Sequence, residues 1–242
     1  MGAFHFSPRP NRASEIGWRD WGPEAFQEAK AQDKPLNEVY KLRLSKIREF
    51  IPLQVKLRIP IFTYYLFSDE VKRREMDFFH LYADSLSEFF ENLADDEMIH
   101  KNKIKISVLG KWYNLPGRLV EAIKKVIEDT KEYDGFFMNF CINYEGQEEI
   151  VDACRLIALK VKAGKLDPEA ISKDDIKENI YSSYFLPPDI IIINDNEPLL
   201  SGFLLWDSVD SYIYNTQKYW PDFTEADLLR IVGDYERIKS NI

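Results

Sequence analysis

The sequence contains little cysteine and no long hydrophobic run. Only 2 of its 242 residues are cysteine, and Cys141 and Cys154 lack the C-x-x-C spacing of a redox or zinc motif. No stretch of about 18 apolar residues is available to span a membrane, and the amino terminus lacks the charged and apolar regions of a signal peptide. These absences argue against a disulfide scaffold, a zinc site or a membrane span. They predict a protein of the cytoplasm, either free or peripheral to the membrane.

Positive charge is also scarce. The chain has 32 Lys and Arg against 41 Asp and Glu, which gives a formal net charge of −9. Proteins that bind nucleic acid broadly depend on basic residues to neutralise phosphates, so this balance argues against nucleic acid as a partner. With 45% hydrophobic residues, the chain has enough apolar material for one large core. We therefore expect one main domain.

Short apolar runs that end in turn residues alternate with amphipathic segments along the chain. The clearest run, Asp189–Ile193, follows Pro188 and precedes a polar Asn-Asp-Asn turn, as expected for a buried parallel strand. This alternation predicts an α/β fold with a mainly parallel central sheet flanked by helices, whose ligands would bind at the carboxyl ends of the strands. The expected strands are 59–67, 103–109, 135–143 and 189–193, and the expected helices are 46–57, 73–93, 115–133 and 148–163.

The stretch 185–223 resembles the last strand and loop of the cis-prenyltransferases, the undecaprenyl diphosphate synthase family. The family pattern is P-D-[IL]-[IV]-I-R-T-G-G-E-x-R-[IL]-S-N-F-L-L-W-Q, followed later by W-P-D-F. Residues 63–74 are similar to the family's T-L-Y-A-F-S-[ST]-E-N-x-x-R, and residues 143–150 are similar to N-Y-G-G-R-x-E-I. The matching residues of the late pattern are Pro188, Asp189, Glu197, Ser201, 203–206 and 220–223.

The same resemblance implies that the catalytic positions are degenerate. The two diphosphate-binding arginines of the late loop are replaced by Ile193 and Leu199, and an aliphatic side chain offers neither the charge nor the donors of a guanidinium. Gln147 stands at the arginine of N-Y-G-G-R, and Tyr212 stands at the metal-binding glutamate after F-L-L-W. The family's D-G-N motif is absent. If residues 3–6 form the first strand, Ser7 occupies the place of its aspartate.

Few groups remain that would hold a diphosphate or a metal ion. Arg74 and Ser201 are the only diphosphate-contacting types carried over, and Ser201 could equally cap a helix that contains F-L-L-W. The carboxylates of this region are interpreted as solvated surface, so no metal ligand is expected. They are Asp195, Glu197, Asp207 and Asp210. Magnesium would be needed only if the chain were an active transferase.

The family dimerises through the segment around F-L-L-W and W-P-D-F, which is well preserved here. Large aromatic side chains often anchor protein interfaces. We therefore expect either a homodimer or a heterodimer with a catalytic cis-prenyltransferase. The expected anchors are Phe203, Trp206, Tyr214, Trp220 and Phe223.

Three functional hypotheses follow from the resemblance. The first is a non-catalytic subunit in polyprenyl diphosphate synthesis that pairs with an active homologue. The second is a divergent isoprenyl transferase that condenses isopentenyl diphosphate with an allylic diphosphate. The third is a polyprenyl-lipid binding module, because helix 73–93 corresponds to a wall of the family's apolar tunnel. Its apolar stripe is equally typical of an ordinary core.

Residues 1–35 are expected to form a separate extension or fragment, and 36–242 the cis-prenyltransferase-like domain. The extension resembles the start of the thioredoxin-like domain of the spermatogenesis-associated protein family, W-x-x-W-x-x-E-A-F-x-x-A-x-x-x-x-K-P, in a run from Trp18 to Pro35. The cysteine pair of that family is absent, so no redox function is expected.

Overall fold

The computed structural model describes residues 13–19, 28–30, 33–68, 76–194 and 199–241. Within these residues, six strands form one sheet in the order β3-β4-β2-β1-β5-β6, and every neighbouring pair is parallel. The predicted α/β class with a parallel sheet is therefore confirmed. The strands are β1 (Glu15–Arg19), β2 (Ile61–Phe67), β3 (Ile104–Leu109), β4 (Phe136–Ile142), β5 (Ile190–Asn194) and β6 (Tyr212–Thr216).

The first described strand, β1, lies at the centre of the sheet. It pairs with β2 on one side and with β5 on the other, with Ile16 opposite both Phe62 and Ile190. Residues 15–19 therefore form part of the central sheet. Trp18 and Ala29, which fit the thioredoxin-like pattern, lie in the main core. The strand expected at residues 3–6 and the adjoining Ser7 lie outside the described residues.

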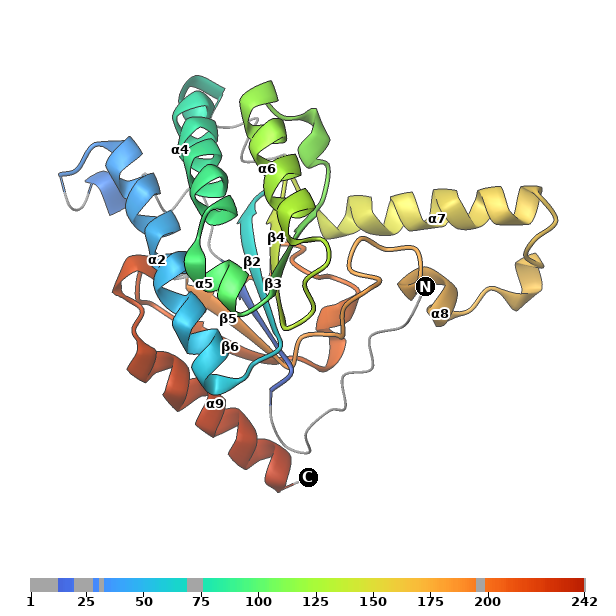
Figure 1. Ribbon diagram of the computed structural model, residues 1–242. Coiled ribbons are helices and arrows are strands. Elements are labelled where there is room, and N and C mark those ends of the chain that lie inside the picture. Colours follow the sequence, from blue (N-terminus) through green and yellow to red (C-terminus); the bar gives the residue numbers. More distant parts are fainter. Residues whose placement is uncertain (1–12, 20–27, 31–32, 69–75, 195–198, 242) are drawn as a thin grey trace.

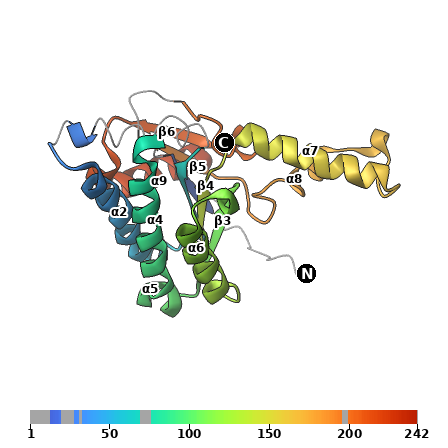
Figure 2. The same ribbon diagram turned by 90° about the horizontal axis from the view of Figure 1, so that it is seen from above.

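Four long helices cover one face of the sheet, which we call the front face (Figure 1). Helix α7 instead projects from the body, and α8 returns beside it (Figures 1 and 2). Helix α2 begins ten residues before the expected position and includes Pro52 in its interior. The front-face helices are α2 (Leu36–Leu57), α4 (Met76–Ala94), α6 (Gly117–Thr130) and α9 (Glu225–Ser240), and the others are α5 (Glu97–Lys101), α7 (Gly146–Lys162) and α8 (Lys173–Lys177).

Large aromatic residues dominate the front-face core. Trp18 of β1 stacks on Tyr64 of β2 with ring centroids 5.0 Å apart, and Tyr64 stacks on Phe140 of β4. Phe89 and Phe90 of α4 pack edge-on against the ring of Phe140. The apolar stripe of α4 therefore contributes to a packed core, as amphipathic helices commonly do.

A second, smaller core lies on the opposite face of the sheet, which we call the back face. It is built from alternate residues of the strands, including Tyr65, Ile191 and Ile193, together with Phe203 and Leu204. Phe203 lies against Gly17 of β1, where a Cβ atom would come within 2.8 Å of its ring. Glycine usually weakens a strand, but the absence of a side chain at Gly17 makes room here for the aromatic ring of Phe203.

The F-L-L-W segment is not helical, contrary to the sequence expectation. Residues 201–206 form successive turns, and a short 3₁₀ helix η3 (Asp207–Asp210) follows. Three residues of the turns have positive φ: 49° at Ser201, 77° at Gly202 and 42° at Leu204. This left-handed backbone cannot continue an α-helix, so Ser201 does not cap one. The chain then enters β6, which contains Tyr212.

Candidate functional site

The carboxyl ends of the parallel strands meet at one edge of the sheet, where ligands bind in open α/β folds. Two buried asparagines occupy this edge in the described part of the chain. Asn143 follows β4 and donates from its side chain to the carbonyl of Lys111 at 3.0 Å, and Asn194 ends β5 and donates to the carbonyl of Lys218 at 3.3 Å. Both side-chain amides donate hydrogen bonds to the backbone of neighbouring loops, so they stabilise the structure of this edge.

Ile193 and Leu199 lie at the two positions where the late pattern has arginine. Ile193 is completely buried in the back-face core with Tyr65 and Phe203, and Leu199 is 56% exposed. A buried aliphatic side chain at the end of β5 leaves no hydrogen-bond donor at that point of the edge. Hydrocarbon therefore occupies both positions, one in the core and one at the surface.

Two lysines at the same edge are already paired with carboxylates. Lys111, which follows β3, contacts Glu148 at 2.6 Å and Asp152 at 3.3 Å, and the hydrogen bond to Glu148 raises the pKa of its ammonium. Lys218, which follows β6, contacts Asp227 at 2.7 Å. Each lysine would have to give up these contacts before it could bind a phosphate.

Two of the other predicted positions lie on neighbouring segments, because Gly146, which precedes Gln147, packs against Gly202, which follows Ser201. Gln147 is exposed in the first turn of α7. Tyr212 lies in β6, where its ring packs near Tyr235 of α9 on the front face. Ser201 lies in the positive-φ turn described above, and Arg74 lies outside the described residues.

No ready-made site for the magnesium ion that the family pattern implies is present among the described residues. They contain no group of three or more His, Cys, Asp or Glu side chains that could hold a metal ion. Tyr212 presents a phenol in a strand where the pattern has a carboxylate, and a magnesium ion is normally held by carboxylates and phosphate oxygens. No metal-dependent step is therefore assigned to these residues.

Three of the five expected interface anchors belong to the core of this chain. Phe203, Trp220 and Phe223 are fully buried. Trp220 donates its indole N–H to the carbonyl of Arg43 at 2.9 Å and packs against Phe50. These three side chains are enclosed by their own chain, so they offer no exposed surface to a partner in this structure. Trp206 and Tyr214 are partly exposed.

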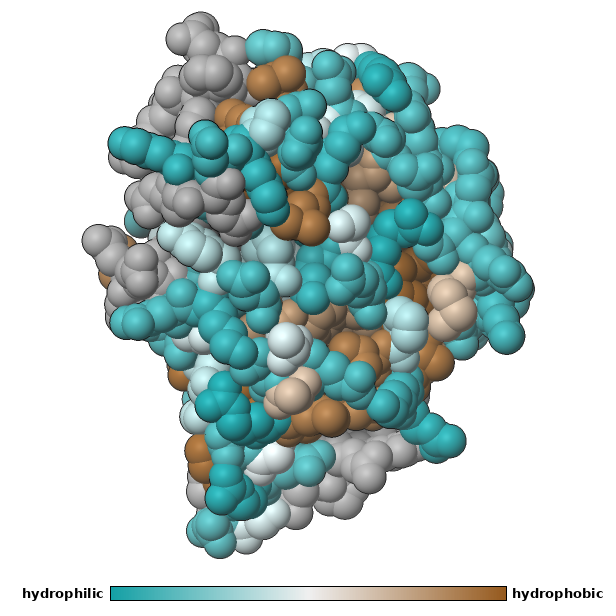
Figure 3. All heavy atoms as spheres, turned by 90° about the vertical axis from the view of Figure 1, so that its left-hand side faces the viewer, coloured by the Kyte–Doolittle hydropathy of each residue, from teal (hydrophilic) through white to brown (hydrophobic). Residues whose placement is uncertain are grey.

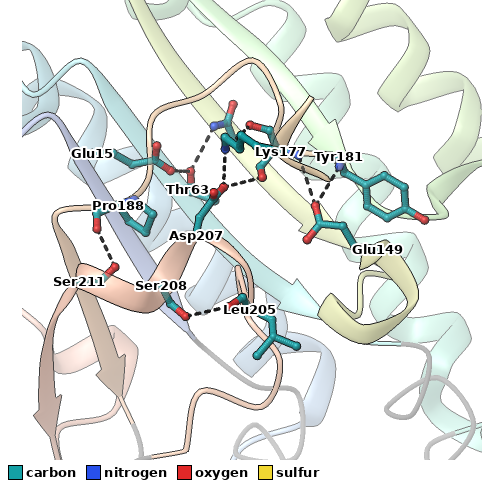
Figure 4. A network of polar contacts seen from close by, with 12 residues as sticks. Glu15, Thr63, Glu149, Lys177, Tyr181, Pro188, Leu205, Asp207, Ser208 and Ser211 are labelled. Carbon is teal, nitrogen blue, oxygen red and sulfur yellow. Dashed lines mark hydrogen bonds and ion pairs between the residues drawn. The ribbon is translucent and has the colours of Figure 1, made fainter. Parts of the chain in front are cut away.

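The back face carries a buried polar network that the sequence analysis missed (Figure 4). The Asp207 carboxylate accepts hydrogen bonds from Lys177 at 2.7 Å and from the Ser182 hydroxyl at 2.6 Å. Asp207 is therefore buried and paired, which corrects its interpretation as solvated surface; Asp210 is exposed as expected. Glu15, a glutamate beside the apolar residues Ile16 and Trp18, was the sequence signal available for this network.

Glu149 binds the backbone of residues 181 and 182 next to this network. Its carboxylate accepts hydrogen bonds from the backbone N–H groups of Tyr181 at 2.9 Å and Ser182 at 3.3 Å, and from the hydroxyl of Tyr144. Burial raises the pKa of Glu149, and the hydrogen bonds from these donors oppose that rise. The residue therefore joins the first turn of α7 to the segment that leads into β5.

The chain is similar to known proteins over most of its length. Residues 27–242 match the family model "Prenyltransf", described as "Putative undecaprenyl diphosphate synthase". The tritrans,polycis-undecaprenyl-diphosphate synthase (geranylgeranyl-diphosphate specific) of Methanocaldococcus jannaschii is 40% identical over 202 residues, which cover 81% of this chain and 71% of that protein. The isoprenyl transferase of Streptococcus pyogenes serotype M6 is 33% identical over 213 residues, covering 86% and 85%.

Solved structures agree with this relationship. The crystal structure of lavandulyl diphosphate synthase from Lavandula x intermedia, in complex with dimethylallyl diphosphate, superimposes with a TM-score of 0.83 and 26% identity, and covers 94% of this chain and 97% of that one. A probable undecaprenyl diphosphate synthase from Campylobacter jejuni shares the fold, with a TM-score of 0.73, 20% identity and coverage of 92% and 94%. The chain belongs to the undecaprenyl diphosphate synthase family of cis-prenyltransferases.

Proposed function

We propose that this chain is a non-catalytic member of its family, a subunit that pairs with an active cis-prenyltransferase in polyprenyl diphosphate synthesis. The observation that carries the proposal is Ile193, buried in the back-face core at the position of a diphosphate-binding arginine. Transfer of a prenyl group requires cations placed in advance against the diphosphate that leaves. Leu199 supplies none, and Lys111 and Lys218 are held by carboxylates.

The test is an elongation assay on the purified chain. We expect no elongated product when the chain is incubated with labelled isopentenyl diphosphate, geranylgeranyl diphosphate and magnesium, because Ile193 and Leu199 occupy both arginine positions of the family pattern. The Methanocaldococcus jannaschii relative serves as the positive control under the same conditions. Sustained chain elongation by this protein alone would remove the proposal.

One observation favours the alternative, a divergent but active isoprenyl transferase. The family pattern places an aspartate after an early strand, and the residue that follows β1 in this sequence is Asp20, which lies outside the described residues. The early aspartate of the pattern would then correspond to Asp20 rather than Ser7. If the elongation assay gives product, Asp20→Ala should abolish it, whereas Asp33→Ala should retain activity as a matched control.

The pairing surface is proposed on the back face beside the edge strand β6. Ile213 pairs in register with Ile191 of the back-face core, so its side chain lies on the same face, and it is 43% exposed. Val209 of η3, which precedes β6, is 82% exposed. Apolar side chains at an open sheet edge are typical of a surface that another chain covers.

The side of the molecule drawn in Figure 3 carries apolar side chains that are mostly set among polar ones. In Figure 3, hydrophobic residues gather mainly in the lower half of the view, between polar neighbours. Leu42 of α2 is 38% exposed, whereas its helix buries Tyr40 and Leu44. Single exposed leucines of this kind are ordinary on protein surfaces.

A further inference from the structure

Glu15 lies at the start of the central strand and points into the back face, where it is almost completely buried. Its Oε1 atom accepts a hydrogen bond from the Thr63 hydroxyl at 2.7 Å, and that hydroxyl accepts one from the side-chain amide of Asn139 at 3.1 Å. Two acceptors in this group, Glu15 Oε2 and Asn139 Oδ1, have no hydrogen-bond partner among the described residues. The cluster therefore has more acceptors than donors.

A proton on Glu15 would supply the donor that the cluster lacks. An ionised carboxylate only accepts hydrogen bonds, whereas a protonated one carries an O–H group that can donate. Unpaired acceptors in a protein interior cost free energy, so the neutral carboxyl suits this environment. Burial raises the pKa of Glu15 from 4.5 to about 8, and the hydrogen bond from Thr63 only partly opposes this rise.

The charged groups around Glu15 also favour its neutral form. Asp207 and Asp189 act to raise its pKa and Lys177 acts to lower it. Lys177 is already bound to Asp207, so one cation would have to serve two buried carboxylates if Glu15 ionised. An ionised Glu15 would therefore add a further negative charge beside Asp207 and Asp189 without a further cation. The groups that act electrostatically around this carboxyl are Asp189, Asp207 and Lys177, with the buried thiol of Cys141 nearby on β4.

Lys177 and Asp207 also attach the segment 177–188 to the back face. The Lys177 ammonium donates to the carbonyl of Ser182 at 3.1 Å and to Asp207 at 2.7 Å, and the Ser182 hydroxyl donates to Asp207. These contacts join the end of α8 and the chain after it to η3 (Figure 4). Any movement of Lys177 toward Glu15 would weaken the attachment.

We propose that Glu15 is a protonation-controlled latch, in which the neutral carboxyl accompanies the closed arrangement of residues 177–188 and the ionised carboxylate accompanies their release from the back face. Release admits water to the carboxylate and lets Lys177 neutralise it. This latch is independent of whether the chain is catalytic, because it lies on the back face and does not use the strand-end loops.

The direction of the pH dependence follows from linkage. The closed form has a raised pKa of about 8 and the open, solvated form has the ordinary value of 4.5. The stabilising effect of the neutral carboxyl is fully present below pH 4.5 and is lost progressively as the pH rises to 8. Opening therefore becomes more favourable by up to about tenfold per pH unit across this window and levels off above it.

The latch can be measured by hydrogen exchange of the whole chain between pH 5 and pH 9. We expect the protection factors of residues 177–188, corrected for intrinsic exchange, to fall with rising pH in the wild type and to stay level in Glu15→Gln. The glutamine amide is a permanent donor of similar shape, so it mimics the neutral carboxyl. Glu178→Gln removes an exposed carboxylate from the same segment and should keep the wild-type slope.

Infrared spectroscopy of the carboxyl group gives a second readout that does not depend on the variant opening or closing. The difference between wild type and Glu15→Gln near neutral pH should contain the C=O band of a protonated carboxyl, and the band should disappear above pH 8. A carboxylate band at neutral pH, or an equal fall of protection in wild type and Glu15→Gln, would overturn the proposal.

Discussion

The ionisation of a single side chain, Asp227, makes the stability of the fold depend on pH. It accepts hydrogen bonds from Lys218 at 2.7 Å and from Thr224, with which it forms the capping box at the start of α9. Burial acts to raise its pKa, but these hydrogen bonds outweigh that effect and lower the pKa to about 2. The ionised form therefore stabilises the fold above pH 4, and this contribution is lost as the pH falls toward 2.

We predict that Asp227→Asn lowers the free energy of unfolding by about 1–2 kcal/mol at neutral pH, since Lys218 is half exposed and its contribution is screened. The difference from wild type should shrink as the pH falls from 4 to 2. Urea denaturation at several pH values measures it, with the exposed Asp222→Asn as the control. An equal effect at pH 2 and pH 7 would show that the charge of Asp227 is unimportant.

The short 3₁₀ helix η4 (Trp220–Asp222) places Trp220 in the front-face core. Its ring packs against Phe50, Tyr64 and Phe223, and its N–H group is bound to the carbonyl of Arg43. This one element joins the chain after β6 to α2 and β2. Its loss would leave a cavity in the packed core.

We predict that Trp220→Ala lowers the free energy of unfolding by about 3–5 kcal/mol, because a large buried side chain is removed from a packed core. Trp206→Ala, at a partly exposed position, should cost less. Urea denaturation with near-ultraviolet circular dichroism measures both. A stable Trp220→Ala variant that differs from wild type only in association would restore the interface role that the structure argues against.

The strands β2 to β5 and the helices α4, α6 and α7 could be predicted because the apolar residues of each follow one clear period. β1 was missed because its five residues include Glu15, Gly17 and Arg19, which seldom occur together in a central strand. Tertiary contacts with Thr63 and Phe203 accommodate the first two. The F-L-L-W turns were misjudged because positive φ at Ser201 and Leu204 has no signal in those residue types.

The candidate site was predictable at the level of residue types only. Replacement of two arginines by Ile193 and Leu199 is visible in the sequence, but their different environments are not. The roles of the aromatic residues required coordinates, because Trp206 and Trp220 look equally suited to an interface. The placing of Asp207 beside Lys177 also required them, since 30 residues separate the two in sequence.

At the scale of the whole molecule, the proposed pairing surface lies beside β6, the edge strand of the sheet in the described residues. We predict a dimer, formed either with itself or with a catalytic homologue, that is weakened by Ile213→Asp. Burying a charge in place of an apolar contact should cost at least the 2 kcal/mol typical of a central contact, or roughly a 30-fold loss of affinity. The fold should persist, because Ile213 lies at the surface.

Sedimentation velocity and circular dichroism on the same samples measure this prediction. Leu42→Asp, which places the same charge on exposed α2, is the matched control and should leave association unchanged. A wild-type chain that remains monomeric, both alone and with an active homologue, would contradict the pairing surface. So would a dimer that Ile213→Asp leaves intact.

The central position of β1 also has a consequence for biosynthesis. Ser14 and Asp189, which are hydrogen-bonded at the junction of β1 and β5, are 175 residues apart in the chain. At ribosomal rates of about 5–20 residues per second, roughly 10–35 seconds separate the synthesis of these two partners. During that time one edge of β1 has no strand to pair with. β2 pairs with the other edge of β1, so a pause in translation before residue 190 would prolong the exposure of the unpaired edge to aggregation and to chaperones.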